Sequence, residues 1–149
     1  MASDMDKIAE ELQKEMLSGY TKVVIDHAQN PRNVGTISDA DGFASVTGPC
    51  GDTMNIWLKV RNDEIKQATF LTDGCGTTIA AGSMVTELVK GRTVVNALRI
   101  TQQDVLDALG GLPEESVHCA LLVANTVKEA AKDYLAMRNE PWKRAYRKT

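Results

Sequence analysis

The pattern of hydrophobic and polar positions along the chain changes its period twice. Between residues 4 and 28, apolar side chains recur at the spacing of one helix face, which predicts an N-terminal helical segment that Gly19 could divide in two. Pro31 marks the end of this segment, because the residue before a proline is pushed out of the helical region. The apolar positions that carry the helical period are Ile8, Leu12, Met16 and Val23.

The middle of the chain alternates apolar and polar residues with a period of two, which is typical of half-buried strands. This alternation predicts strands over residues 54–60 and 65–71, and a shorter strand precedes them over residues 43–47. The stretch Arg61-Asn62-Asp63 lies between the two longer strands and has the composition of a hairpin turn. We therefore expect a small antiparallel meander.

After the strands the helical period returns. It predicts helices over residues 79–90 and 94–98, and a third over residues 101–109 whose start has the form of an N-cap box. A long amphipathic helix follows over residues 113–135, opened by a proline and two acidic residues that suit a first helical turn. The order helix, strands, helices is that of an α+β domain, and no linker divides residues 1–149.

Composition narrows the class of protein. The chain has 149 residues, of which 43% are hydrophobic and 25% charged, as in ordinary soluble globular proteins. Its net charge of -3 argues against a nucleic-acid binder, which would present a basic face. No apolar run could cross a bilayer and the N-terminus does not resemble a secretion signal, so we expect a cytoplasmic protein that does not bind membranes. The basic C-terminal tail, residues 141–149, is either solvated or a docking strip for an acidic partner.

The candidate chemistry lies in three cysteines, an odd number that cannot form a complete set of disulfides within one chain. Cys50 and Cys75 each stand beside glycine at a predicted strand–loop boundary, where glycine leaves room for a bulky ligand. Cys119 follows His118 near the start of the long helix, where the helix macrodipole favours thiolate, so we expect a lowered pKa for this thiol. Asp52 adds an oxygen ligand close to Cys50.

Each of these residues also has a purely structural interpretation. The cysteines are too far apart for a zinc-finger or ferredoxin pattern, and Cys119 could simply fill the core. Asp52 could form a turn, and His118 could lie on the surface or in the core. We expect His27 to be structural. Neighbouring side chains on a helix point about 100° apart, so we expect His118 and Cys119 to be poorly placed as a catalytic dyad.

Four motifs occur in a fixed order along the chain. They are Asn30-Pro31-Arg32-Asn33-Val34-Gly35, Cys50-Gly51-Asp52, Gly74-Cys75-Gly76 and His118-Cys119. In this combination the sequence resembles the U-type iron–sulfur cluster assembly scaffolds, IscU and the N-terminal domain of NifU, over residues 18–134. The resemblance implies an α+β fold in which helices pack on a small three-stranded antiparallel sheet and the cysteines converge at one exposed end.

The resemblance also implies roles for the candidate residues. Cys50, Cys75 and Cys119 would bind cluster iron as thiolates, and either His118 or Asp52 would supply the remaining ligand. Asp52 would make the cluster labile, since a carboxylate is a harder and weaker ligand for cluster iron than a thiolate. Cys119 would accept sulfur from a cysteine desulfurase. The product would be a [2Fe–2S] cluster passed to recipient apo-proteins, so the chain would be a scaffold and not an enzyme.

Several alternatives stay open at this level. One protomer could hold the cluster, or a homodimer could share it. Zinc could replace iron on the same ligands, as in a zinc-dependent sulfurtransferase, or the chain could be a small interaction domain with buried cysteines. Docking of a dedicated Hsp70 chaperone is not expected, because Leu112-Pro113-Glu114-Glu115-Ser116 replaces the Leu-Pro-Pro-Val-Lys sequence that family members often carry. The chain lacks the insertion between the second and third cysteines that is typical of SufU proteins.

Overall fold

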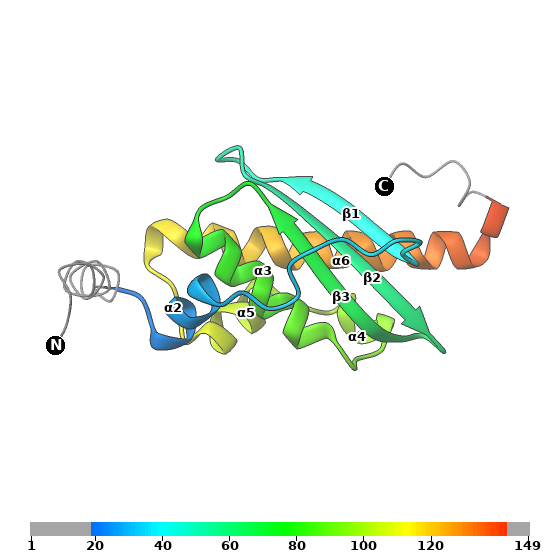
Figure 1. The fold of residues 1–149 in the computed structure, drawn as a ribbon, viewed down its shortest axis with the longest axis horizontal. Coiled ribbons are helices and arrows are strands. Elements are labelled where there is room, and N and C mark those ends of the chain that lie inside the picture. The colour runs from blue at the N-terminus through cyan, green and yellow to red at the C-terminus, as the bar shows by residue number, and fades with distance from the viewer. Residues whose placement is uncertain (1–18, 143–149) are drawn as a thin grey trace, which may run out of the picture.

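The computed structural model describes residues 19–142 as one sheet with helices packed on it (Figure 1). In chain order the elements are α2 (Lys22–Gln29), β1 (Gly42–Thr47), β2 (Thr53–Arg61), β3 (Glu64–Thr72), α3 (Gly76–Val89), α4 (Val94–Ala97), α5 (Gln102–Leu109), the 3-10 helix η1 (Glu114–Ser116) and α6 (Val117–Asn139). The predicted α+β class and the three predicted strands are confirmed.

The sheet is an antiparallel meander in the order β1-β2-β3. Its β2–β3 connection is the predicted hairpin turn, in which Asn62 and Asp63 have φ angles of 55° and 61°. Asparagine and aspartate tolerate this left-handed conformation better than most residues, which explains their presence here. At the opposite end of the sheet, β1 and β2 are joined by the loop of residues 48–52, and β3 leads into α3.

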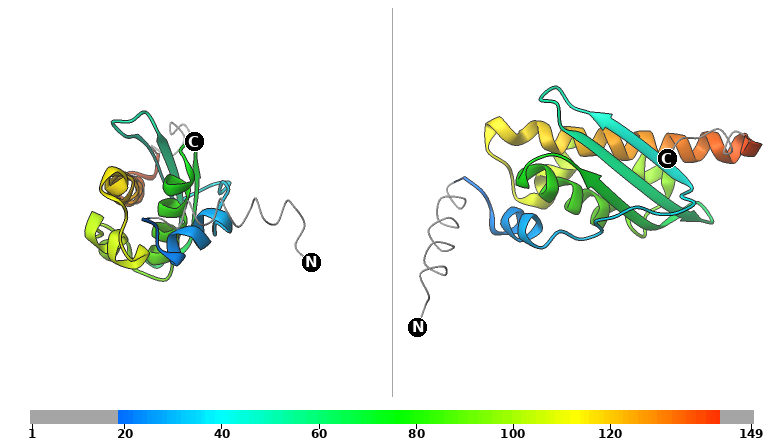
Figure 2. Two further views of the ribbon diagram at one scale, coloured as in Figure 1. Left: turned by 90° about the vertical axis from the view of Figure 1, so that its left-hand side faces the viewer. Right: turned by 45° about the horizontal axis from the view of Figure 1, so that its top comes forward.

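One face of the sheet is covered by α3 and α6, and α5 packs on both of these helices (Figures 1 and 2). The alternation along β2 sends Met54, Ile56 and Leu58 into this core, where all three are fully buried. Helix α3 approaches β3 so closely at Gly82 that a Cβ there would lie 2.7 Å from the Phe70 ring. Gly82 therefore fixes the position of α3 on the sheet.

The other face of the sheet is crossed by the segment between α2 and β1 (Figure 1). Phe70 of β3 exchanges backbone hydrogen bonds with Asn33 and Gly35 of this segment, and Asp41 then donates to the carbonyl of Leu58 in β2. The Asn-Pro-Arg-Asn-Val-Gly motif is thus the start of a strap that partly covers a sheet otherwise open on this side.

At the hairpin end, α6 is tied to the β2–β3 turn. The Asp63 carboxylate accepts hydrogen bonds from the Tyr134 hydroxyl at 2.7 Å and from the Arg138 guanidinium at 2.9 Å. Nearby, the start of β1 lies against α6 with no space between them, since a Cβ on Gly42 would be 2.5 Å from the Ala130 carbonyl oxygen. This end of the sheet is therefore closely packed.

The helix predictions hold with three corrections. Helix α2 begins only after Thr21, whose hydroxyl accepts from Val24 N, and Gly19 at φ 103° precedes it. Val23 is 40% exposed and does not continue the predicted apolar stripe, because the buried side of α2 carries Val24 and Ile25 instead. The acidic turn after Pro113 is the 3-10 helix η1, so α6 starts later than predicted.

Of the remaining sequence predictions, one is confirmed, and two concern segments outside the described residues. The N-cap box of α5 is present, with Thr101 and Asp104 bonding to each other's backbone N–H. Residues 4–18 of the predicted N-terminal helix and most of the basic tail, residues 143–149, lie outside the described residues. Among residues 19–142, no helix combines the length and the apolar character that a membrane span requires.

Candidate functional site

The five predicted site residues come from three segments at the end of the sheet opposite the hairpin. Cys50 and Asp52 lie in the β1–β2 loop, Cys75 lies between β3 and α3, and the pair His118 and Cys119 lies in the first turn of α6. The β1–β2 loop turns at Gly51, which has a φ of 90° and donates to the Gly48 carbonyl. Asp73 then ties the loop to the end of β3 by accepting from Thr53 N at 2.8 Å.

Cys75 is the N-cap residue of α3 and is exposed. Burial of part of its side chain acts to raise the pKa of the Cys75 thiol, but hydrogen bonds from Thr78 and Thr77 to the sulfur outweigh it and lower the pKa below its usual value. The free N–H groups at a helix start stabilise a thiolate in this way. The helix-terminus effect that the sequence predicted for Cys119 therefore acts on Cys75.

Cys119 differs from this expectation because it is buried, with 3% of its surface exposed. Burial raises the pKa of the Cys119 thiol, the Thr78 hydroxyl partly offsets this rise, and negative charge on Cys75, Cys50 and Asp52 adds to it. The predicted lowering of this pKa was wrong because desolvation at this position outweighs the helix macrodipole. Cys119 also packs in the main core cluster, as its structural interpretation proposed.

His118 lies between two of the cysteines. Its Nε2 atom is 3.3 Å from Cys50 Sγ and 3.7 Å from Cys119 Sγ. Despite their different angular positions on the helix, the two side chains are in contact. Their poor placement as a catalytic dyad stays a prediction, and 3.7 Å is long for direct proton transfer.

Thr78 connects the remaining members, and the sequence analysis did not identify it. Its hydroxyl donates to Asp52 Oδ2 at 3.2 Å and lies 3.5 Å from Cys119 Sγ and 3.8 Å from Cys75 Sγ. The signal that could have found it is spacing, since residues three apart on a helix share a face and Thr78 follows Cys75 by three.

Thr78 and His118 thus link the five predicted residues through a chain of contacts. This arrangement is not a closed metal-binding group, because within the described part of the chain no three or more His, Cys, Asp or Glu side chains are grouped as a metal site requires. Convergence of the three thiols on one ligand stays a prediction. The donor types fit cluster iron, since thiolate and imidazole are its usual ligands and a carboxylate would be a weaker one.

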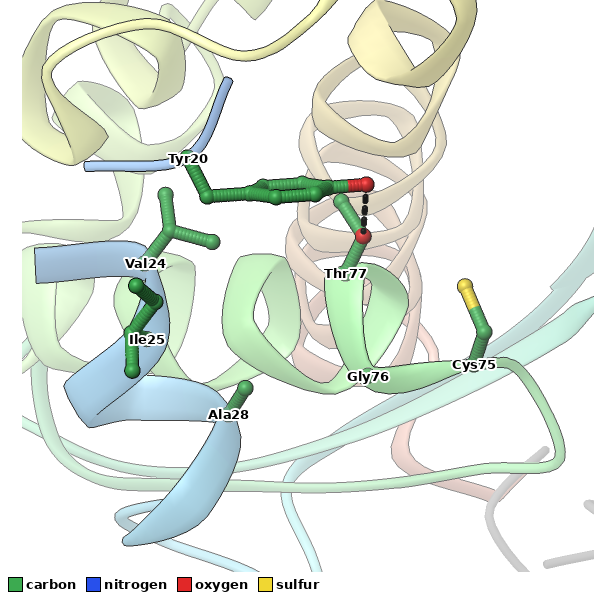
Figure 3. A pocket seen from close by; sticks show the side chains of 7 residues that line it. All are labelled: Tyr20, Val24, Ile25, Ala28, Cys75, Gly76 and Thr77. Carbon is green, nitrogen blue, oxygen red and sulfur yellow. Dashed lines mark hydrogen bonds between the residues drawn. The ribbon is translucent and has the colours of Figure 1, made fainter. Parts of the chain in front are cut away.

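An apolar pocket of about 240 Å³ adjoins this group, between α2 and the start of α3 (Figure 3). Val24 and Ile25 form its apolar wall, Cys75 lies at one edge, and the Tyr20 ring lies over it. The Thr77 hydroxyl donates to Tyr20 Oη at 3.3 Å. The exposed cysteine therefore borders both the polar contact group and an apolar recess.

His27 is structural, as expected from the sequence. It is buried, and its Nδ1 lies 2.7 Å from Ser83 Oγ, which joins α2 to α3. Burial lowers the pKa of His27, so the ring is neutral near pH 7. No interaction of His27 with the cysteine group is found among the residues described.

Comparison with known sequences gives one family and several close relatives. Residues 19–141 match the NifU-like N terminal domain. The iron-sulfur cluster assembly scaffold proteins IscU 1 and IscU 2 of Archaeoglobus fulgidus are each 49% identical over 116 residues, which cover 77% of this chain and 76% of the relative. The scaffold protein IscU of Aquifex aeolicus is 46% identical over 119 residues, with coverage of 78% and 76%.

Solved structures with the same fold are more distant in sequence. The N-terminal part of a nitrogen-fixing NifU-like protein from Brucella abortus has a TM-score of 0.62 at 20% identity and covers 78% of this chain and 94% of its own. The SufU protein of Fervidobacterium islandicum has a TM-score of 0.60 at 19% identity, with coverage of 75% and 96%. At these identities the likeness concerns the fold alone.

Proposed function

Because this chain belongs to the NifU-like N-terminal domain family, and with it to the IscU iron–sulfur cluster assembly scaffolds, we propose that it builds a labile [2Fe–2S] cluster and passes it on. It is a scaffold and carrier and not an enzyme. The observation that carries the proposal is the contact group at the end of the sheet, in which three thiols, an imidazole and a carboxylate are linked through Thr78 and His118.

The three cysteines bind the two irons of the cluster as thiolates. Cys50 and Cys75 are exposed and can take up iron directly, whereas Cys119 forms the inner wall of the site. A cluster with two irons needs four protein ligands, so three thiolates leave one position for Asp52 or His118. A carboxylate in that position makes the cluster easier to release, which suits a scaffold.

Sulfur arrives at Cys119 from a cysteine desulfurase. The Cys119 thiolate attacks the outer sulfur of the enzyme's persulfide, a new S–S bond forms on Cys119, and the enzyme's cysteine leaves as a thiolate with the electron pair of the broken bond. Reduction of the transferred sulfur to sulfide takes two electrons from a separate thiol or electron-carrier protein. Because Cys119 is 3% exposed, the first turn of α6 must open when the desulfurase docks.

The finished cluster is handed to recipient apo-proteins in the cytoplasm. Either one protomer supplies all four ligands, or two protomers share a cluster in a homodimer. The same thiolate, imidazole and carboxylate ligands suit zinc, so zinc can replace iron at this site when iron is scarce. Docking of a dedicated Hsp70 chaperone plays no part in the proposal, because the segment before His118 carries Glu114 and Glu115.

Anaerobic reconstitution tests the function. The chain is mixed with a cysteine desulfurase, cysteine, a thiol reductant and ferrous iron, and then analysed by visible absorption and by iron and sulfide assays. We expect equal amounts of iron and sulfide with sulfur-to-iron charge-transfer bands in the wild type, and loss of both in Cys75→Ser. The Asp52→Ala variant should keep its cluster longer than the wild type.

Two results would contradict the proposal. Iron and sulfide that both stay near zero in folded wild-type protein would exclude a cluster scaffold. Zinc retained at one ion per chain, with faster desulfurase turnover and no sulfide bound, would identify the zinc-dependent sulfurtransferase instead.

A further inference from the structure

We propose that the Thr78 hydroxyl is a positioning group that holds the Asp52 carboxylate beside Cys75 and Cys119, so that Asp52 rather than His118 becomes the labile ligand of the cluster. This inference rests on the proposed scaffold function and assigns a role to a residue outside the predicted site. It concerns the choice between the two candidate non-cysteine ligands, which the sequence leaves open.

The contacts divide the site into two halves that share Cys119. In one half, His118 Nε2 lies near Cys50 Sγ at 3.3 Å and Cys119 Sγ at 3.7 Å. In the other half, Thr78 Oγ1 lies near Cys119 Sγ at 3.5 Å and Cys75 Sγ at 3.8 Å. Asp52 belongs to the second half through its bond from the Thr78 hydroxyl, at 3.2 Å.

The environment of Thr78 holds this hydroxyl in place. Its side chain is fully buried in the first turn of α3 and packs on Gly74, where an added Cβ would lie 2.7 Å from Thr78 Cβ. A buried hydroxyl without a partner destabilises the folded state, and this favours the bond from Thr78 to Asp52. Glycine before Cys75 is therefore needed to leave room for the Thr78 side chain.

The Thr78 hydroxyl has one proton and can therefore donate only one hydrogen bond. In the structure that proton is donated to Asp52, so the two thiols can interact with the hydroxyl only as donors or through weak contacts. The hydrogen bond draws electron density from the carboxylate, which makes Asp52 a weaker ligand for iron. This effect favours a cluster that is held loosely.

The test compares Thr78→Val, which has the same shape without the hydroxyl, with Thr78→Ser, which restores the hydroxyl. Thr126→Val is the matched control, because Thr126 is also buried in a helix but donates only to the Leu122 carbonyl of its own helix. Each variant is reconstituted anaerobically, and the half-life of its cluster is measured in excess iron chelator.

We expect Thr78→Val to lengthen the cluster half-life about tenfold, the factor that corresponds to one hydrogen bond to a charged group. Thr78→Ser and Thr126→Val should match the wild type. In the Asp52→Ala background, Thr78→Val should have no further effect, and nitrogen couplings from His118 should appear in the electron spin-echo spectrum of the reduced Thr78→Val cluster.

An unchanged half-life in Thr78→Val would overturn the inference, and so would an equal effect of this substitution with and without Asp52. If Thr78→Val does not fold, Thr78→Ala replaces it in the same comparison.

A second measurement does not depend on cluster assembly. Cobalt(II) alone is titrated into the reduced apo-protein, and its d–d absorption bands report the ligand set. We expect Thr78→Val to shift these bands and to tighten binding about tenfold, with Thr78→Ser unchanged. If the wild type builds no cluster, the proposed function fails, while identical cobalt spectra in wild type and Thr78→Val would refute the role of Thr78 by itself.

Discussion

The two ends of the sheet are built in opposite ways. At the hairpin end, the Asp63 carboxylate accepts short hydrogen bonds from Tyr134 and Arg138. At the cysteine end, sulfur contacts range from 3.3 Å at Cys50 to 3.8 Å at Cys75. Sulfur is a weak partner in hydrogen bonds, so these contacts add little to the stability of the fold.

This difference assigns the two ends of the sheet different roles, with the hairpin end contributing to stability and the cysteine end to cluster binding. At the hairpin end, one ion pair and one hydrogen bond hold the Asp63 turn against α6, so replacing their members should affect only the fold. At the cysteine end, thiol and imidazole groups lie next to one another and interact only weakly. A metal ligand can therefore replace these contacts with little loss of free energy. We therefore expect substitutions at the first end to change the free energy of unfolding and those at the second to change cluster binding.

The sharpest test of this separation is Cys50→Ser. We expect the iron and sulfide content after reconstitution to fall nearly to zero, because one cluster ligand is lost. The free energy of unfolding should stay within about 0.5 kcal/mol of the wild type, since Cys50 is exposed. Metal analysis and urea unfolding of one preparation check both statements, and a large loss of stability would contradict the comparison.

At the other end, Gly42→Ala should have the largest effect on stability. The new Cβ would lie 2.5 Å from the Ala130 carbonyl oxygen, so β1 and α6 must move apart. We expect a loss of about 1–3 kcal/mol in the free energy of unfolding, as for overpacking in a core.

Ser45→Ala on the same strand is the control for this substitution, because Ser45 is exposed and its replacement should have little effect. Cluster content per folded molecule should equal the wild type in both variants. A Gly42→Ala protein of full stability but without a cluster would reverse the assignment of roles to the two ends.

The two cysteines nearest Thr78 should react at different pH. Thiolate is the form that iodoacetamide attacks, and the pKa is lowered at Cys75 and raised at Cys119. As pH rises, Cys75 should therefore be alkylated first, and at pH 7 it should react faster than Cys119, because more of it is thiolate and Cys119 is also buried.

Mass spectrometry of the apo-protein after timed alkylation measures this order. Addition of a desulfurase should speed the reaction of Cys119 if docking opens the first turn of α6. Equal rates at the two residues across the pH range would show that burial does not protect Cys119.

The smallest effect is expected for Tyr134→Phe, which removes one donor from Asp63. The expected loss in the free energy of unfolding is small, because water competes for a hydrogen bond at this exposed position. Arg138 still pairs with Asp63, so the turn should keep its conformation. Urea unfolding measures the loss, and an increase in stability would show that this hydrogen bond does not stabilise the hairpin end.

Much of the fold was predictable because its signals are local. Strand alternation, the left-handed turn at Asn62 and Asp63, and the N-cap box at Thr101 each depend on a few neighbouring residues. The error at Val23 had the same origin, since one period was extended across Gly19 into a helix that begins separately at Thr21.

The site was predictable only in part. Glycine and histidine neighbours identified the three cysteines, but burial of Cys119 depends on how α3, α6 and the sheet pack, which no local pattern encodes. The reach of His118 back to its neighbour depends on a side-chain rotamer. Thr78 was missed because its only sequence signal is its spacing from Cys75, and its contacts with Cys119 and Asp52 depend on how the elements pack.

The close approach of α3 to the sheet at Gly82 has a consequence for changes in chain length. One residue inserted or deleted between Thr78 and Gly82 would turn the start of the helix by about 100° relative to its anchored part. Cys75 and Thr78 would then turn together away from Cys119, although every residue of the site was still present. We therefore expect a change in the length of this segment to abolish the site without replacing any of its residues.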